Sequence, residues 1–333
     1  MSIDKKPAID LIIPGLLNLP IHELSFAELA SSTPALHKLL RYASRVPAAL
    51  ADVDEILIRR LGLQQAALPF AHAIRPQHKG PQLLFKPVHL KADINNAIVY
   101  PVNSDEDKLL SIINDLTEFF KDDCEVISLP DNRWLMTLLN CEPVTEVPHY
   151  LTALGKKVTH YLEQSKANLE WFKLFNEMQM FLYQHEVNQH RQQTGQLLIN
   201  SLWCWGADQY QGEKLTDTLW FSDDSDMRKI GELYAGNADY IENIKLTDIT
   251  SNMVIIDLSI LKLLKGNDDL DTHQVLQYVE ENCFEVLMKT RKHQIIVHTG
   301  GGFNFHYGAM SDLKFWKKYS DLREVILQSQ PQH

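Results

Sequence analysis

Short apolar runs alternate along the chain with longer segments in which apolar residues recur every three or four positions. The runs are five to eight residues long, the length of a buried strand, and they lie at Ile9–Ile13, Leu198–Trp205, Met253–Leu258 and Gln294–Thr299. The longer segments have helical spacing, and they lie at 33–43, 47–61 and 271–286. This alternation predicts an α/β fold with a doubly wound, mostly parallel sheet.

Residues that begin helices stand where the periodicity requires them. Thr33 precedes Pro34, so Thr33 is expected to cap a helix whose first position is Pro34. Asp271 precedes Gln274 by three residues, which is the spacing of a capping box. A last helix is predicted to begin near Ser311.

The pattern changes in the middle of the chain, after a link at 68–81 that is rich in proline, histidine and glycine. The predicted elements beyond it are strands at 87–93 and 97–102, a helix at 105–120, a hairpin around Pro130–Arg133 and an apolar helix face from Trp171 to His185. We therefore predict an α/β core domain over 1–85 and 197–333, with a smaller α+β domain inserted over 86–196.

Composition narrows the class of protein. The 333 residues are 45% hydrophobic and 23% charged, as in an ordinary globular protein, and the formal net charge is −11. Because no stripe of Lys and Arg offsets this charge, we expect no nucleic-acid partner. The apolar stretch at Ile9–Ile13 is interrupted by Asp10, so it predicts a first strand rather than a signal peptide. No apolar run is long enough to span a bilayer, and no membrane association is expected.

The four cysteines, Cys124, Cys141, Cys204 and Cys283, are scattered and form no C-x-x-C pair. This spacing predicts free thiols in a reducing cytoplasm and argues against a zinc site.

The densest group of polar candidates lies in the stretch HEVNQHRQQTGQLLINSLWCWG, residues 185–206. His185, Asn188 and Arg191 are three residues apart, and they can converge on an anion, with Arg191 binding phosphate or carboxylate through two hydrogen bonds. The alternative is a helix end at which Asn188 and His185 satisfy terminal carbonyl groups. Asn200, in the strand that follows, needs hydrogen-bond partners if it is buried, which makes it a further ligand candidate.

Two other groups are weaker candidates. Gly300-Gly301-Gly302 follows a predicted strand, but no helix begins directly after it, so a loop is favoured over a phosphate cradle. His298 and His306 flank these glycines, and their spacing gives no support to a metal site with Asp257.

Three segments resemble the inserted domain of archaeal-type cofactor-independent phosphoglycerate mutases. They are PVHLKAD at 87–93, Thr145-x-x-Pro148-His149 and the 185–206 stretch. The resemblance is closer to a bacterial group of shortened relatives, the RpfE-type regulatory proteins. It implies an alkaline phosphatase-like core, and it places Lys91 where related mutases carry an Arg for the phosphate of the substrate. It also implies that Lys91, His185, Asn188, Arg191 and Asn200 border a ligand cleft.

The same resemblance shows what the chain lacks. The related enzymes hold two divalent metal ions on Asp and His side chains at strand ends, and two such cations clamp the attacking and leaving oxygens. The first strand there ends in Asp-Gly, whereas this chain has Pro14-Gly15. The last core strand there ends in Asp-His-Gly, whereas this chain has Thr299-Gly300 and no Asp-His pair anywhere. Residues 46–66, where a nucleophilic serine is expected, contain no Ser.

The sequence therefore predicts a catalytically degenerate, phosphoglycerate mutase-like protein without a cofactor, which binds a small anionic metabolite, phosphorylated or carboxylate, in a regulatory role. One alternative is an active metal-dependent phosphomutase or phosphatase of the 2,3-bisphosphoglycerate-independent type, which requires manganese or zinc. The other is a protein-interaction module without a ligand. Catalytic residues are not assigned, and a protein partner is compatible with each of these hypotheses.

Overall fold

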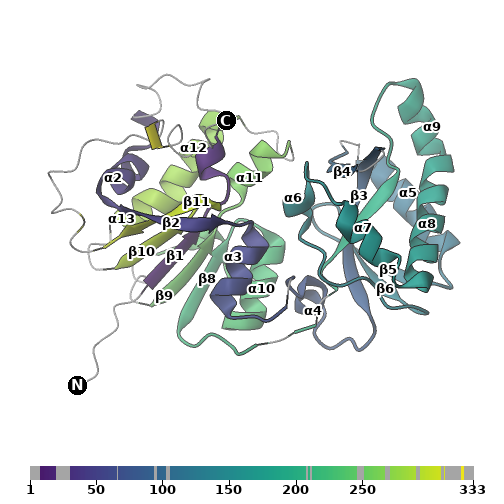
Figure 1. Cartoon of the computed structure of the whole chain (residues 1–333), viewed down its shortest axis with the longest axis horizontal. Helices are drawn as coiled ribbons and strands as arrows, with labels where there is room; N and C mark the ends of the chain where they lie inside the picture. Colours follow the sequence, from purple (N-terminus) through teal and green to yellow (C-terminus); the bar gives the residue numbers. More distant parts are fainter. Residues whose placement is uncertain are drawn as a thin grey trace. The chain divides into compact units, whose positions relative to one another are not determined.

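The chain forms two compact units in the computed structural model (Figure 1). The structure describes residues 8–19, 31–65, 67–93, 96–102, 106–207, 209–210, 212–245, 251–266, 271–289, 293–308, 311 and 324–325. The first unit combines 1–61 with 212–333, and the second comprises 62–211. The chain passes between the units at 61/62 and 211/212, whereas we expected 85/86 and 196/197. The difference arises because strands β3 (Gln82–Asp93) and β7 (Ser201–Trp205) pair with each other in the second unit.

The first unit is built on a six-stranded sheet with the order β2-β11-β10-β1-β9-β8. Four neighbouring strands, β10, β1, β9 and β8, are parallel, and β11 and β2 add antiparallel strands at one side. The bounds are β1 Ala8–Ile12, β2 Ser44–Leu50, β8 Thr218–Ser222, β9 Asn252–Ile256, β10 Gln294–His298 and β11 Gly301–Tyr307. The predicted α/β class with a parallel-containing sheet is confirmed.

Helices cover both faces of this sheet (Figure 1). Ile9 and Leu11 of β1 pack with α2 and α12 in one core, while Asp10 faces α3 on the other side. The elements are η1 Leu16–Asn18, α2 Pro34–Tyr42, α3 Val53–Leu61, α10 Ser225–Ala235, η3 Ile241–Asn243, α11 Ser259–Leu264, α12 Thr272–Val279, η5 Glu280–Phe284 and α13 Glu285–Met288. The capping box of Asp271 and Gln274 is present at α12 as predicted. The helix predicted from Ser311 falls almost wholly outside the described residues.

The prediction of one helix over 47–61 is wrong. The structure has strand β2 over Ser44–Leu50 and helix α3 only from Val53. Pairing of β2 with β11 overrides the helical spacing of Ala49 and Leu50. Pro47 lacks an N–H group, and β2 tolerates it because it is an edge strand.

Helix α2 is capped from a distant part of the chain. Thr33 is the N-cap residue and Pro34 the first residue of α2, as predicted. The Thr33 hydroxyl, however, contacts His37 and makes no cap hydrogen bond. The Glu280 carboxylate instead accepts from the backbone N–H groups of Ala35 and Leu36. Glu280 opens the π-helical turn η5, so a local change of helix geometry aims this carboxylate at the start of α2.

The second unit is an antiparallel sheet with the order β4-β3-β6-β5, in which β7 also pairs with β3. Asp131 and Asn132 have positive φ in the predicted β5–β6 hairpin. The elements are α4 Phe70–Ile74, β4 Asn96–Tyr100, α5 Glu106–Phe119, β5 Cys124–Leu129, β6 Arg133–Leu138, α6 Tyr150–Ala153, α7 Thr159–Ser165, α8 Leu169–Gln184 and α9 Glu186–Gln193. Helices α5 and α8 pack their apolar faces on the sheet in a single core. Across the described residues, we find no helix with both the length and the apolarity needed to cross a membrane.

Gly231 allows α10 to lie directly on β8. A Cβ atom at this position would stand 2.3 Å from Cδ1 of the buried Trp220. We expect Gly231→Ala to destabilise the protein by about 2 kcal/mol, because overpacking outweighs the gain in helix propensity. The measurement is urea unfolding, together with the near-ultraviolet circular dichroism of the tryptophans.

The matched control is Gly236→Ala, where φ is +73° and nothing lies within 4 Å of the added Cβ. That change should cost about 1 kcal/mol through its backbone conformation alone and leave the tryptophan signal unchanged. Equal costs for the two variants would show that Trp220 does not set the spacing of α10.

Candidate functional site

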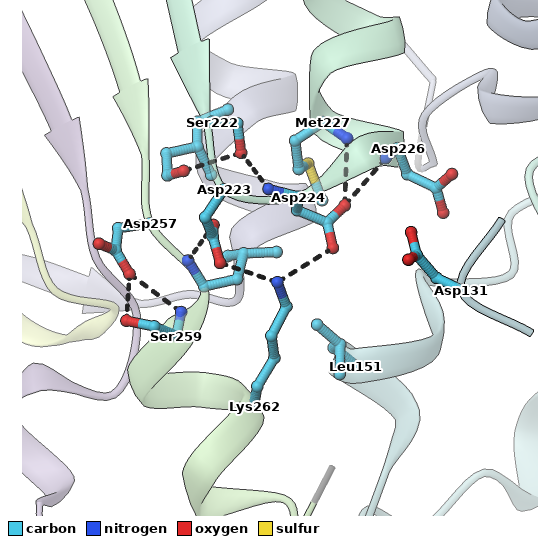
Figure 2. Close-up of polar contacts among 12 residues, drawn as sticks. Asp131, Leu151, Ser222, Asp223, Asp224, Asp226, Met227, Asp257, Ser259 and Lys262 are labelled. Carbon is cyan, nitrogen blue, oxygen red and sulfur yellow. Dashed lines mark hydrogen bonds and ion pairs between the residues drawn. The ribbon is translucent and has the colours of Figure 1, made fainter. Parts of the chain in front are cut away.

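Acidic side chains collect where the parallel strands of the first unit end (Figure 2). Asp223 and Asp224 directly follow β8, and Asp257 directly follows β9. The Asp257 N–H donates to the Ile12 carbonyl at 2.9 Å, so Asp257 also lies beside the end of β1. Parallel strands deliver their carboxyl ends to one edge of a sheet, which is where α/β proteins commonly place their sites.

A lysine from α11 reaches into this acidic group. Figure 2 shows the Lys262 ammonium in contact with both Asp223 and Asp224. It lies 2.8 Å from Oδ2 of Asp223 and 3.6 Å from Oδ2 of Asp224. All three side chains are largely buried, with 20% of Lys262, 10% of Asp223 and 14% of Asp224 exposed. A cation of this chain therefore already neutralises part of the acidic edge.

The remaining oxygens of Asp223 and Asp224 accept backbone hydrogen bonds. Oδ1 of Asp223 accepts from the Leu258 N–H at 2.8 Å. Oδ1 of Asp224 accepts from the N–H groups of Asp226 and Met227 at 3.0 and 3.2 Å, which caps the first turn of α10. Both carboxylates thus fix the loops that follow the strands.

Asp257 is fully buried and is held by a separate set of donors. Its Oδ1 accepts from the Ser259 N–H at 2.9 Å and from the Ser259 hydroxyl at 2.5 Å. The Cys283 thiol donates to Oδ2 at 3.5 Å. These contacts place Asp257 among buried partners of its own chain.

Burial and the neighbouring charges at this edge of the sheet shift the pKa values of Asp223, Asp257 and Lys262. Burial raises the pKa of Asp223, and repulsion from Asp257 and Asp224 adds to this, so that the pKa reaches about 7 despite the opposing charge of Lys262. Burial likewise raises the pKa of Asp257. For Lys262, burial lowers the pKa, but the charges of Asp223 and Asp224 outweigh it and the net pKa is raised. The ammonium is therefore retained as a fixed positive charge.

The other strand ends at this edge supply weaker ligands. After β10, the Thr299 hydroxyl donates to the Phe303 carbonyl at 2.6 Å and accepts from the Gly301 N–H. Gly300 has φ +70°, and a Cβ there would stand 2.4 Å from the Ala51 carbonyl oxygen. Gly300 therefore forms the tight turn, while Gly301 and Gly302 begin β11 and do not lie in a loop as the sequence analysis favoured. A strand and not a helix follows the turn, so the three glycines do not form a phosphate cradle at a helix start. Asp223 and Asp224 are the residues of this edge whose oxygens suit a hard cation once Lys262 is displaced.

A second polar group lies within the sheet, on the face toward α3. Asp10 of β1 binds Nε2 of His298 through Oδ1 at 2.9 Å and Nε of Arg60 through Oδ2 at 2.6 Å. Burial alone raises the pKa of Asp10, but the hydrogen bond from His298 and the charge of Arg60 outweigh it and the net pKa is lowered. His298 is therefore joined to Asp10, and no contact within the described part of the chain joins it to Asp257.

Among the residues predicted to bind a ligand, Asn188 is buried and fully occupied by backbone. Its Nδ2 donates to the carbonyl oxygens of Leu182 and Ile199, both at 2.6 Å, and its Oδ1 accepts from the Ile199 N–H at 2.8 Å. The contact with Leu182 caps the end of α8, which is the alternative that the sequence left open. Asn188 therefore fastens the segment before β7 to the turn between α8 and α9.

Arg191 and Asn200 also contact backbone. Nε of the buried Arg191 donates to the Leu197 carbonyl at 2.6 Å. Asn200 accepts from the Leu90 N–H at 2.7 Å and donates to the Leu90 carbonyl at 3.0 Å, so it extends the pairing of β7 with β3. These contacts give both side chains a structural role.

His185 and Lys91 differ from this group. Nδ1 of His185 accepts from the Val187 N–H at 3.2 Å, which caps α9, and Nε2 contacts Oδ2 of Asp115 at 3.0 Å. Asn188 and Arg191 thus contact the residues just before β7, and Asn200 is itself one of these residues. His185 instead contacts Asp115 of α5, and Lys91 is exposed on β3.

The sequence analysis missed Asp223, Asp224 and Lys262. It placed no strand at 218–222, although Leu219-Trp220-Phe221 is an apolar run followed at once by Ser-Asp-Asp. Two aspartates directly after such a run were the signal for an acidic strand end.

Comparisons with known proteins give a likeness of fold. A scan against protein-family models finds no match, and a search of curated proteins finds none. A solved structure titled "Structure of PH0037 protein from Pyrococcus horikoshii" has 13% identity and a TM-score of 0.52, with 97% of this chain and 92% of that chain covered. The chain shares its fold with that protein. Another, a cofactor-independent phosphoglycerate mutase from Thermoplasma acidophilum, has 12% identity and a TM-score of 0.45, with 96% and 94% covered.

Lys262→Met keeps the length of the side chain and removes its charge. We expect a loss of about 3 kcal/mol in the free energy of unfolding at about pH 8, because Asp223 and Asp224 lose their counter-charge. A carboxyl whose pKa is raised by folding stabilises the protein below its unfolded pKa and loses that contribution as the pH rises through the folded value. Since the variant raises the pKa of Asp223 further, the loss should be smaller at about pH 5. Urea unfolding at both pH values measures this.

Lys229→Met is the control, since Lys229 forms an exposed pair with Glu232 three residues on. It should change stability by less than about 1 kcal/mol at either pH. A Lys262→Met protein as stable as the native one at both pH values would rule out the buried ion pair.

Asp10 gives the opposite pH dependence. Because folding lowers its pKa, the carboxylate stabilises the folded protein above its unfolded pKa, and this contribution is lost as the pH falls through the folded value. Asp10→Asn should therefore cost about 3 kcal/mol at about pH 7, and this cost should decrease as the pH is lowered below the unfolded pKa of about 3.9. Urea unfolding as a function of pH tests this, with the exposed Asp122→Asn as the control. A cost that does not vary with pH would contradict the ion pair.

Proposed function

We propose that this is a phosphoglycerate mutase-like protein that binds a small anionic metabolite in a regulatory role and does not transfer a phosphoryl group. The observation that carries the proposal is the position of the Lys262 ammonium between Asp223 and Asp224. It stands at the edge of the sheet where an α/β enzyme would hold its reacting groups.

Metal-assisted phosphoryl transfer requires carboxylates with free oxygens, which two cations then bridge to the substrate. At this edge the oxygens of Asp223 and Asp224 hold Lys262 and backbone N–H groups, and Asp257 holds Ser259 and Cys283. A divalent ion would have to displace a buried ammonium and break helix caps. This cost supports a protein that keeps the architecture without the metal chemistry.

The active enzyme is a second candidate, favoured by the same acidic group. Three aspartates lie at the carboxyl ends of neighbouring strands, and oxygen ligands of this kind suit Mn²⁺. The two candidates differ in what they require of Lys262, because an active site must release its ammonium from Asp223 and Asp224.

Binding of Mn²⁺ separates these candidates. We expect Mn²⁺ to leave the melting temperature of the native protein unchanged, because Lys262 already neutralises the edge. Lys262→Met should gain a Mn²⁺-dependent rise in melting temperature, since the ammonium then no longer neutralises Asp223 and Asp224. Differential scanning fluorimetry with Lys229→Met as the matched control measures both.

Turnover and anion binding complete the experiment. The native protein with Mn²⁺ should leave 3-phosphoglycerate unchanged, while millimolar phosphorylated or carboxylate metabolites should raise its melting temperature. Conversion of 3-phosphoglycerate would establish the enzyme instead. Stabilisation by none of these anions would favour a protein-interaction module.

A further inference from the structure

A polar pocket lies within the second unit, and its lining includes none of the aspartates at the strand ends of the first unit. It has a volume of about 510 Å³, within the range of about 300–1,000 Å³ that small-molecule sites occupy. Residues from three segments line it. The first segment is 71–82, which runs from α4 to the start of β3, the second is 142–145, and the third follows β7 at 206–210. Residue 208 is not among the described residues. We call it the histidine pocket, after His72 and His78.

Gly206, the last residue of the 185–206 stretch, lines this pocket. Gly206 has φ +76°, and a Cβ there would stand 2.8 Å from the Cβ atom of Phe70. Its carbonyl accepts from the Ala71 N–H at 3.0 Å. Glycine at this position thus allows the chain after β7 to lie directly against α4, which brings Tyr210 over His72 with the ring centroids 5.8 Å apart.

The lining carries more groups able to bind an anion than acidic ones. His72, His78 and Lys79 line the pocket, and the carboxylate among the lining residues is that of Glu142. The ammonium of Lys79 balances the carboxylate of Glu142, and the two imidazoles add nitrogen atoms that can donate hydrogen bonds to an anion.

His78 supplies a second, independent observation. Its Nε2 atom is enclosed, and it has no hydrogen-bond partner among the described residues. Gly80 lies so close that a Cβ there would stand 2.9 Å from this nitrogen. Because an enclosed nitrogen without a partner costs free energy, a rotation of the His78 ring that brings Nε2 to an oxygen of a ligand in the pocket would be favourable.

We infer that the histidine pocket binds a small phosphorylated metabolite, with its phosphate facing His78 and Lys79. A lysine ammonium meets phosphate as a point charge, and an imidazole adds a single directed hydrogen bond. The stacked rings of His72 and Tyr210 leave the remaining volume to the organic part of the ligand. The inference rests on the proposed function, because it names the site at which the regulatory anion binds.

The test compares binding of inorganic phosphate, 3-phosphoglycerate and citrate to the native protein and to a double variant, His78→Gln with Lys79→Met. Isothermal titration calorimetry should show 3-phosphoglycerate bound more tightly than citrate, and the double variant should weaken its binding by at least about tenfold. Addition of inorganic phosphate should shift the imidazole resonances of His78 in a ¹H–¹⁵N spectrum. The matched control is His190→Gln with Lys173→Met on exposed positions of α9 and α8, which should bind like the native protein.

Thr145→Trp fills the pocket from an exposed loop position without removing a charge, so it should abolish binding even if the double variant does not fold. Native affinity in both variants would overturn the histidine pocket while leaving the proposed function standing. Absence of binding of every anion by the native protein would overturn both. Tighter binding of citrate than of 3-phosphoglycerate would indicate a carboxylate ligand and would contradict the inference.

Discussion

A polar group that leaves water must find a hydrogen-bond partner, and this constraint decides what each candidate residue of this protein does. In the first unit, the carboxylates of Asp223 and Asp224 find an ammonium and backbone N–H groups. In the second unit, Asn188 and Asn200 find backbone carbonyl and N–H groups. The side chains that resemble a ligand site are thus largely committed to holding their own chain in place.

Local signals in the sequence predicted much of the fold. The Asp271–Gln274 capping box lies within three residues, and the hairpin around Asp131 and Asn132 depends on two neighbouring residues, so each was visible without tertiary context. The helix predicted over 47–61 failed because its first part is a strand that pairs with residues 301–306, some 250 positions away. Helical spacing cannot reveal a partner at that distance.

The difference between local signals and contacts of distant residues also explains which parts of the candidate site the sequence predicted. The sequence identified Asn188 and Arg191 as a polar group at a helix end, yet their roles depend on backbone atoms six to eleven residues away. Lys262 stands 39 residues from Asp223, and nothing in the spacing joins the two. The histidine pocket likewise needs three separate segments to meet, so its residues share no motif. The contacts that the sequence did not predict are therefore those between segments that are separated along the chain and meet only in the folded protein.

The remote cap on helix α2 sets an order of assembly. A helix of nine residues gains little stability from its own hydrogen bonds, and the N–H groups at its start are satisfied by Glu280, about 245 residues later in the chain. During synthesis on a ribosome, the amino-terminal segment emerges long before this acceptor exists. The hydrogen bonds that cap α2 can therefore form only after η5 has been translated. Completion of the first unit therefore follows translation of the whole second unit, which lies between α2 and η5 along the chain.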